Sequence, residues 1–284
     1  MYRVGILGTE NSHAMAFTEI INDNAEGKYS DFKVTALYGL EKTPSEAIKA
    51  KYPDITIVEN IADMVDIVDC AMITARHGKY HKPFAMPFIE AGKPVFVDKP
   101  FTISIAEGYD LIDAAKKYKV PIMGGSGCKY CDELLEYKAE ILSGKIGNVQ
   151  SAVMSFAADM KSEYGGFYFY GAHLVEMAMT VFGCDVKGIS AFVKNGHLST
   201  ILRYDALDLL LSFAKSYTAV AYGEKGYIFK NITTNNIYNY EIDHFTEMVR
   251  TGKSSMSEDQ LIKPIIVLNA IEESLKYHTS IDFI

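Results

Sequence analysis

The sequence of 284 residues has no tryptophan, only four cysteines and few arginines, and each scarcity narrows the class of protein. Four cysteines are too few for a disulfide scaffold in a chain of this length. Acidic residues outnumber basic ones by 36 to 28, which gives a formal net charge of −8. The arginines that would bind polyanions are scattered, at Arg3, Arg76, Arg203 and Arg250. We therefore expect no nucleic-acid partner.

Long apolar runs and a leader pattern are also missing. The longest apolar stretches, such as residues 265–268, fall far short of the ~18 residues that cross a bilayer. Residues 1–8 run directly into an apolar strand pattern, without the cationic start and cleavage site of a signal peptide. We expect a cytoplasmic protein with no membrane partner.

Over its first ~125 residues the sequence alternates short apolar runs with amphipathic segments. Strands are predicted at 2–8, 32–38, 67–74, 95–97 and 120–123. Helices are predicted between them, at 12–22, 44–52, 81–91 and 104–118. The last of these helices opens with a capping box formed by Ser104 and Glu107. This order predicts an α/β domain with a parallel sheet over residues 1–125.

The remainder of the chain, residues 126–284, has a different pattern. Strands are predicted at 149–156, 186–193, 198–204, 207–213, 218–222 and 227–232. Two helices, at 240–250 and 258–277, close the chain. Because few helices separate the strands, we expect an α+β domain with a largely antiparallel open sheet.

The turn after the first strand, residues 8–13, reads Gly-Thr-Glu-Asn-Ser-His. In dinucleotide-binding domains this turn meets the pyrophosphate and carries glycines at its first, third and sixth positions. Only Gly8 is present here, with Glu10 and His13 in the other two places. The turn is therefore either an ordinary capped strand–helix turn or a phosphate site. In the second case its contacts are Gly8, Thr9, Asn11 and Ser12.

The end of the second strand offers another test, because a carboxylate there would bind the adenosine ribose of NAD. The sequence reads Tyr38-Gly39-Leu40-Glu41, with no acid at the strand tip itself. Either Glu41 reaches the ribose from further along, or this contact is missing. The tip leaves the choice between NAD and NADP open.

Residues 66–101 contain three short blocks in a fixed order. A strand ends at Thr74, His81 follows, and an Ala-Gly-Lys turn at 91–93 leads to a strand that ends in Asp98-Lys99-Pro100. In these blocks the sequence resembles the Gfo/Idh/MocA family of glucose–fructose oxidoreductases and inositol dehydrogenases, whose strand ends in Glu-Lys-Pro. The family plan is a Rossmann-like domain followed by an α+β domain, and it implies NAD or NADP as cofactor.

By this resemblance, Lys99 lies beside the nicotinamide and the substrate hydroxyl as a catalytic residue. An ammonium at a strand tip can polarise a hydroxyl or stabilise alkoxide charge, which suits that role. The resemblance also places further residues along the cofactor, namely Thr74, Arg76, His81, Asp98 and Lys99 itself. His77 and His81 are spaced i, i+4, but no third ligand is apparent nearby, so we expect no metal.

In the second domain, residues 165–176 resemble the family segment Asp-x-Gly-x-His-x-x-Asp. His173 matches its catalytic histidine, the candidate general base, and Glu176 matches its last acid. Phe169 stands where the family has its catalytic aspartate. This departure, with Glu10 and the bare strand tip, supports an alternative: a non-catalytic family member that binds a small molecule or a protein partner.

Two further patterns have more than one interpretation. The aromatic run either stacks on a carbohydrate ring or another planar ligand, or fills the domain interface; it comprises Tyr164, Phe167, Tyr168, Phe169 and Tyr170. Cys128 and Cys131 have the spacing of a redox motif. They lack both a second pair for zinc and the thioredoxin context, so we interpret them as structural.

The sequence therefore predicts two domains, residues 1–125 and 126–284. The expected activity is hydride transfer between NAD or NADP and a sugar, polyol or related hydroxyl compound. Lys99 would polarise the reacting oxygen, and His173 would handle its proton. By analogy with the family, we also expect a homo-oligomer.

Overall fold

The computed structural model describes residues 1–24 and 27–283, and the chain divides into two compact units. The first unit contains Met1–Gly125 and Tyr238–Leu261, and the second contains Ser126–Ile237 and Ile262–Ile284. The sequence predicted a single division at residue 125. It did not predict that residues 238–261 belong to the first unit. This segment returns because its helix carries an apolar face that completes the first unit's core.

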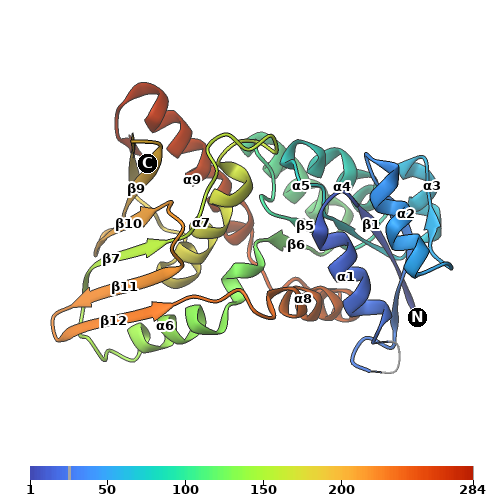
Figure 1. Cartoon of the computed structure of the whole chain (residues 1–284), viewed down its shortest axis with the longest axis horizontal. Coiled ribbons are helices and arrows are strands. Elements are labelled where there is room, and N and C mark those ends of the chain that lie inside the picture. Colours follow the sequence, from blue (N-terminus) through green and yellow to red (C-terminus); the bar gives the residue numbers. More distant parts are fainter. Residues whose placement is uncertain (25–26, 284) are drawn as a thin grey trace. The chain divides into compact units, whose positions relative to one another are not determined.

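The first unit is built on a six-stranded parallel sheet with the order β3-β2-β1-β4-β5-β6 (Figure 1). Its strands are β1 (Tyr2–Leu7), β2 (Phe32–Tyr38), β3 (Thr56–Ile57), β4 (Cys70–Ile73), β5 (Val95–Asp98) and β6 (Ile122–Gly125). The strand order reverses between β1 and β4, and ligands of such sheets bind at the carboxyl ends of the strands at this point. The predicted parallel α/β domain is confirmed.

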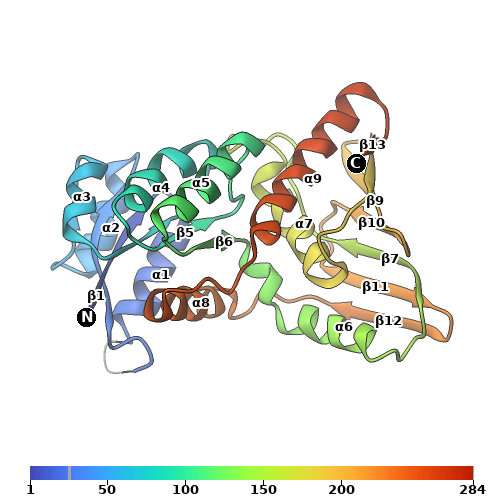
Figure 2. The same ribbon diagram turned by 180° about the vertical axis from the view of Figure 1, so that it is seen from behind.

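Helices pack on both faces of this sheet. The helices are α1 (Ser12–Asn22), α2 (Lys42–Lys51), α3 (Ile61–Ile67), α4 (His81–Glu90), α5 (Ile105–Tyr118) and α8 (Ile237–Thr251), with a short 3-10 turn, η1 (Gly78–Tyr80). α8 lies beside α1 in both views, although more than 200 residues separate them in sequence (Figures 1 and 2). Phe17 of α1 and Phe245 of α8 are buried in one core with Phe32 and Phe96 of the sheet. Each such ring contributes roughly 1.5–3 kcal/mol by burial.

Two strands of the first sheet differ from the sequence prediction by two residues or more: β6, predicted at 120–123, is found at Ile122–Gly125, and β4 differs at its start. The strand predicted at 67–74 is wrong at its start, because Ile67 ends α3 and β4 begins at Cys70. β3 and α3 were not predicted at all. Both are short, with two and seven residues, so neither shows a full period of apolar positions.

The second unit contains a seven-stranded sheet with the order β12-β11-β7-β10-β9-β8-β13. Its strands are β7 (Val149–Ser155), β8 (Gly188–Lys194), β9 (His197–Arg203), β10 (Asp208–Ser212), β11 (Thr218–Gly223), β12 (Gly226–Asn231) and β13 (Ile281–Asp282). Among the pairs described, β7 and β10 run parallel and the others run antiparallel. The predicted largely antiparallel sheet is confirmed.

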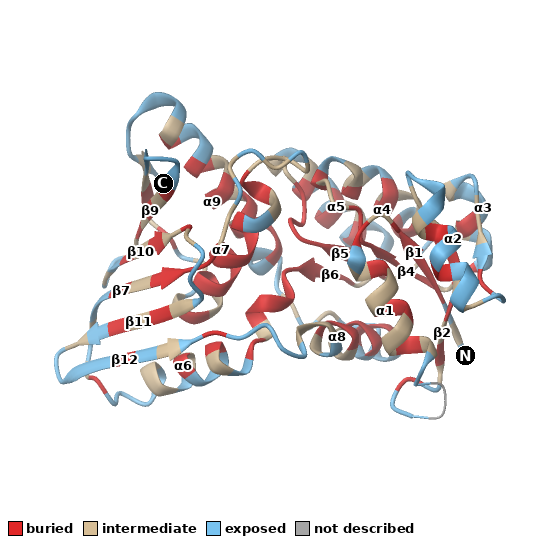
Figure 3. Ribbon diagram, viewed as in Figure 1, coloured by how far each residue is buried: buried red, intermediate tan, exposed pale blue. Residues whose placement is uncertain are grey.

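The helices of the second unit are η2 (Gly127–Tyr130), α6 (Asp132–Leu142), α7 (Tyr168–Phe182) and most of α9 (Glu258–Tyr277). α7 is buried over most of its length, which Figure 3 shows as a nearly continuous red helix. Two of its buried side chains, His173 and Glu176, can carry charge and therefore need partners inside the protein. Within the described parts of the chain, no helix has both the length and the apolarity to cross a membrane.

Candidate active site

One side chain, Asn11, ties together the carboxyl ends of β1, β4 and β5. Its amide nitrogen donates to the carbonyl of Thr74 at 2.8 Å and to Oδ2 of Asp98 at 3.3 Å. Its Oδ1 accepts from the backbone N–H of His13 at 3.2 Å and so caps α1. The side chain of Asn11 is therefore used for hydrogen bonds within the protein, whereas Ser12 is the exposed first residue of α1.

The turn itself is tightly packed backbone. Gly8 has a φ of +103°, and a Cβ there would lie 2.1 Å from the backbone nitrogen of Ala75, so only glycine fits. Thr9 is buried, and its hydroxyl lies 2.7 Å from Oγ of Ser45. The Thr74 hydroxyl donates to the carbonyl oxygens of Leu7 and Gly8. The side chains of Thr9 and Thr74 therefore shape the turn from within.

Asp98, the acid before the candidate catalytic lysine, is fully buried. Nδ1 of His13 lies 2.7 Å from its Oδ2, and the backbone N–H of Lys99 donates to its Oδ1 at 2.7 Å. Burial by itself raises the pKa of Asp98, but His13 and then Lys99 outweigh burial and hold that pKa below its ordinary value. His13 was not predicted as a site residue, because a histidine in a glycine position does not reveal its partner.

Lys99 follows β5 directly and is only 3% exposed. The loop after it is held by His81, which is fully buried. Nδ1 of His81 lies 2.7 Å from the carbonyl oxygen of Pro100, and Nε2 lies 2.7 Å from that of Ala75. His81 therefore joins the loop after β4, where Arg76 is partly buried, to the loop that carries Lys99.

The two neighbouring histidines of the β4 loop have hydrogen-bond partners within the protein. His77 accepts from the N–H of Lys79 at 3.2 Å, and both ring nitrogens of His81 face carbonyl oxygens. Burial, followed by the charges of Lys79 and His81, lowers the pKa of His77. Within residues 1–24 and 27–283, no three His, Cys, Asp or Glu side chains are grouped as metal ligands.

A cavity of ≈ 390 Å³ lies at the carboxyl ends of β2 and β3. This is where dinucleotide-binding domains hold the adenosine. A Cβ on Gly39 would lie 2.0 Å from Oγ1 of Thr9, so the strand tip has no room for an acid. The carboxylates that line the cavity are instead Glu46 and Glu59, and Glu59 pairs with Lys42 at 3.2 Å. Sequence analysis missed both because neither follows β2 directly.

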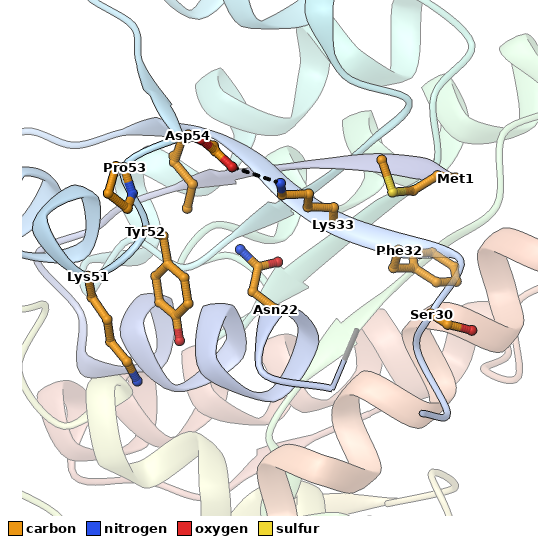
Figure 4. Close-up of a pocket in the computed structure, with 10 residues that line it drawn as sticks. Met1, Asn22, Ser30, Phe32, Lys33, Lys51, Tyr52, Pro53 and Asp54 are labelled. Carbon is orange, nitrogen blue, oxygen red and sulfur yellow. Dashed lines mark hydrogen bonds and ion pairs between the residues drawn. The ribbon is translucent and has the colours of Figure 1, made fainter. Parts of the chain in front are cut away.

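A second cavity, of ≈ 430 Å³, lies at the amino ends of β1 and β2 (Figure 4). Lys33 and Asp54 on its wall pair with each other at 3.2 Å. Because ligands of parallel sheets bind at the carboxyl ends of the strands, we do not assign this cavity to the active site.

In the second unit, His173 of α7 contacts the segment that precedes η2. Its Nδ1 lies 2.6 Å from Oγ of Ser126. The backbone N–H of Ser126 donates to Oε2 of Glu176 at 2.8 Å, and Nζ of Lys129 lies 3.2 Å from the same oxygen. His173 and Glu176 thus share Ser126 as a partner. The sequence did not indicate this role for Ser126, because the contact depends on how η2 packs against α7.

Aromatic rings form a wall that runs past His173. The centroids of Tyr170 and Phe156 lie 5.6 and 5.3 Å from that of His173. The wall continues through Tyr217 on one side and Phe169 and Tyr164 on the other, at centroid distances of 4.5, 5.0 and 5.1 Å. Tyr170 and Tyr217 are 43% and 45% exposed, so the wall offers ring faces to a ligand.

The other half of the aromatic run is part of the core. Phe167 and Tyr168 are 5% and 6% exposed, and the hydroxyl of Tyr168 donates to Oε2 of Glu272 at 2.9 Å. The two interpretations of the run therefore apply to different members of it.

Cys128 and Cys131 are free thiols buried in η2 and at its end. The hydrogen bond with Cys131, together with burial, raises the pKa of Cys128 to about 12. Because thiolate is the reactive form, this environment supports the structural interpretation of the pair.

A doubly wound parallel sheet with a packed glycine turn after β1 is the architecture of a dinucleotide-binding domain. Residues 2–126 match the family GFO_IDH_MocA, described as "Oxidoreductase family, NAD-binding Rossmann fold". This match covers the amino-terminal part of the chain, and it confirms the resemblance to the Gfo/Idh/MocA family stated from the sequence.

Curated relatives agree with this assignment. The chain is 24% identical to scyllo-inositol 2-dehydrogenase (NADP+) IolU of Bacillus subtilis in an alignment of 328 positions that covers 97% of each chain. It is 26% identical to the uncharacterized oxidoreductase YdgJ of Escherichia coli in an alignment of 237 positions that covers 75% of this chain and 66% of the relative.

Solved structures show the same fold. Myo-inositol 2-dehydrogenase from Lactobacillus plantarum superposes with a TM-score of 0.85 at 16% identity, covering 100% of this chain and 99% of the other. Scyllo-inositol dehydrogenase from Lactobacillus casei, with bound NAD(H) and scyllo-inositol, gives a TM-score of 0.85 at 14% identity and covers 99% of each chain.

Proposed function

We propose that the protein is an NAD(P)-dependent oxidoreductase that transfers a hydride between the nicotinamide and a polyol, sugar or related hydroxyl compound. The observation that carries the proposal is the buried Lys99 at the end of β5, in a region that matches an oxidoreductase family. The polyol class is supported by relatives whose names describe inositol dehydrogenases.

The residues of the first unit fit a dinucleotide. Gly8 allows a close approach of backbone, the amino end of α1 with Ser12 suits the pyrophosphate, and the ≈ 390 Å³ cavity suits the adenosine. Glu10 is the departure, since its Oε2 is buried and has no hydrogen-bond partner among the described residues. When bound, the nicotinamide would supply the hydride acceptor or donor.

In this proposal the chain's own side chains act at the reacting oxygen. Lys99 polarises that oxygen, and the ring of His173 hydrogen-bonds it. The exposed part of the aromatic wall stacks on the substrate ring, as Tyr and Phe faces do on the C–H faces of cyclic polyols. The proposed cofactor contacts are Gly8, Thr9, Asn11, Ser12, Thr74, Arg76, His81, Asp98 and Lys99. Of these, Asn11, Thr74, His81 and Asp98 act chiefly by holding the turn and the loops in place.

Replacing Lys99 with methionine tests the proposal. We expect Lys99→Met to bind NADH or NADPH with micromolar affinity but to lose about 10³-fold or more in turnover, because the reacting oxygen loses the amino group that polarises it. Binding is measured by calorimetry on nucleotide-free protein, and turnover by nicotinamide absorbance with inositols and sugars. Lys117→Met, on the exposed side of α5, is the matched control.

Two outcomes would count against the proposal. Unchanged turnover in Lys99→Met would remove the lysine from the mechanism. Failure of the folded wild-type protein to bind any of the four nicotinamide nucleotides would favour the non-catalytic alternative.

We also propose a cytoplasmic homo-oligomer. The second unit's sheet has one apolar row that its helices leave partly exposed, with cross-strand neighbours Phe229, Val220, Val153, Leu210 and Ile201. A second copy of the chain would bury this row, as symmetric oligomers do with matching apolar patches. Light scattering during gel filtration measures the molar mass of the protein in solution and so tests whether it is an oligomer.

A further inference from the structure

The Ser126 hydroxyl has few possible partners, and they constrain its proton. Ser126 is fully buried, and its Oγ accepts the backbone N–H of Cys128 at 3.1 Å. Its other contact is Nδ1 of His173 at 2.6 Å. A hydroxyl has one proton to donate and two lone pairs. Among the described residues, Nδ1 of His173 is the acceptor within reach of that proton.

The alternative arrangement leaves a buried donor unsatisfied. If Nδ1 of His173 carried the proton, Oγ of Ser126 would accept two hydrogen bonds, and its own O–H would have no acceptor among the described residues. An unsatisfied buried donor costs about 1–3 kcal/mol. The hydrogen bonding therefore favours donation from Ser126 to Nδ1.

Two other groups beside this pair do not reverse the preference. The Cys128 thiol also lies within hydrogen-bonding range of the His173 ring, but its raised pKa keeps it protonated and a weak acceptor. Glu176 accepts from the backbone N–H of Ser126 and pairs with Lys129, so its bonded oxygen serves those two donors.

From this geometry we propose that Ser126 holds neutral His173 as the tautomer with its proton on Nε2, so that His173 donates a hydrogen bond to the reacting oxygen instead of taking its proton. Ser126 is then a positioning residue. This inference rests on the proposed function for the role of the reacting oxygen, but the tautomer itself is a property of the protein alone.

Phe169 explains why this chain differs from the general-base role expected from the resemblance. An aspartate at position 169 would lie one turn before His173 on α7, within reach of its ring. A carboxylate only accepts, so one that contacts Nδ1 would keep the proton there and free Nε2 to act as a base. With phenylalanine there, Ser126 sets the opposite tautomer.

The reaction balances with this assignment. In the oxidation direction, a bound nicotinamide would supply the hydride acceptor as the alcohol carbon becomes a carbonyl, and the hydroxyl proton would pass to the Lys99 amine. The Nε2–H of His173 stays on the ring and stabilises the oxygen as it gains negative charge. In the reduction direction, the Lys99 ammonium returns the proton to that oxygen.

Nitrogen NMR on the protein without cofactor tests the tautomer directly. The protein is labelled with 15N-histidine and measured at pH ~8.5, where an ordinary histidine is neutral. His173 is assigned by its loss in His173→Gln. We expect a protonated Nε2 and an unprotonated Nδ1 in wild type, and averaged signals from mixed tautomers in Ser126→Ala.

Three variants complete the experiment. Adding Phe169→Asp to Ser126→Ala should move the proton to Nδ1, whereas adding Phe169→Leu should leave the signals mixed. Ser155→Ala is the matched control, because that buried hydroxyl of the same unit has no hydrogen-bond partner among the described residues. We expect wild-type signals from Ser155→Ala.

The result has a kinetic counterpart. Ser126→Ala should lower kcat by about ten- to a hundredfold with little change in KM, because an oriented donor is lost from the transition state. A protonated Nδ1 in wild type, or His173 signals that do not change in Ser126→Ala, would overturn the inference. Since the NMR needs no nucleotide, failure of the proposed function appears separately, as absent nucleotide binding.

Discussion

His13 occupies the place of a glycine whose usual purpose is to let a helix approach a strand closely. Here the side chain fills that place and makes a different attachment. Its ring packs against Tyr238 and Phe17, with centroids at 4.7 and 5.6 Å, and its Nδ1 contacts the Asp98 carboxylate. α1 is thus joined to the end of β5 by a polar side-chain contact, next to the candidate catalytic lysine.

This buried carboxylate makes the free energy of unfolding depend on pH. The folded protein lowers the pKa of Asp98, so the stabilisation is fully present above the unfolded pKa of about 3.9 and is lost as pH falls through the lower folded pKa. We expect Asp98→Asn to lower the unfolding free energy at pH 7 by about 2–3 kcal/mol, because Asn11, His13 and the N–H of Lys99 lose a charged acceptor.

The check is urea denaturation between pH 3 and 7. Asp98→Asn should show a smaller loss of unfolding free energy than wild type as pH falls below about 4. Asp54→Asn, which removes an exposed carboxylate, should keep the wild-type curve. If the unfolding free energy of Asp98→Asn fell with pH as much as that of wild type, the protonation of Asp98 would not contribute to the pH dependence of stability.

For single residues, the sequence predicts which side chains are candidates for a site better than it predicts which side chains contact each other. Lys99 and His173 are predicted as site residues because they stand in short motifs, where residue type and order suffice, and both remain predictions. His13 and Ser126 were missed because each gains its role from a partner far away in sequence. Glu10 and His13 in glycine positions, and Phe169 in place of the aspartate, show where the sequence departs from the family pattern. They do not show which side chains make the contacts that replace the missing ones.

Among the elements, those with a full amphipathic period or strong caps were predicted best. The residue ranges of α1, β2 and α9 agree with the prediction. α6 was missed although it has acids in its first turn and buried Leu134 and Tyr137 three residues apart, because its apolar stripe is narrow and the strands around it dominated the pattern. Local periodicity thus determined most elements of the fold.

The ion pair between α2 and the segment after β3 bears on cofactor choice. Lys42 is paired with Glu59 at the ≈ 390 Å³ cavity proposed for the adenosine, so its charge is partly neutralised. We expect Glu59→Gln to raise the NADPH-to-NADH affinity ratio about three- to tenfold, because the freed ammonium can meet a 2′-phosphate and one repulsive carboxylate is removed.

Fluorescence titration with both reduced nucleotides measures this ratio. Asp54→Asn changes the net charge equally at the other end of the strands and should leave the ratio unchanged. A ratio in Glu59→Gln equal to that of wild type would show that the 2′ position of the ribose does not reach this pair.

For the whole molecule, the sequence predicted two fold types but not the route of the chain between them. The pattern of α8 shows that one face is buried, and it does not show against which sheet. Ile242, Phe245 and Met248 on that face belong to the core of the first unit. Such assignments depend on the fit between surfaces distant in sequence, which a local pattern does not contain.

Fragments test how far the first unit depends on this helix. A fragment of residues 1–125 should fail to fold, because its core lacks α8 and leaves Phe17 and Phe32 uncovered. Joining residues 238–261 to it through a glycine–serine linker should restore a folded unit, and Phe245→Asp in the joined fragment should abolish folding again. Circular dichroism and amide NMR measure both. Cooperative unfolding of residues 1–125 alone would contradict the prediction.

The late position of α8 also has a consequence for protein synthesis. The ribosome releases the strands and helices of residues 1–125 first, yet their core closes only after Val249 has emerged. At roughly 5–20 residues per second, the intervening ~125 residues take about 6–25 s to make. During that interval the nascent first unit exposes an apolar sheet face, and strands β7 to β12 of the second sheet emerge before α8 covers that face. Chaperone occupancy on the growing chain should therefore last until residues 238–261 have left the exit tunnel.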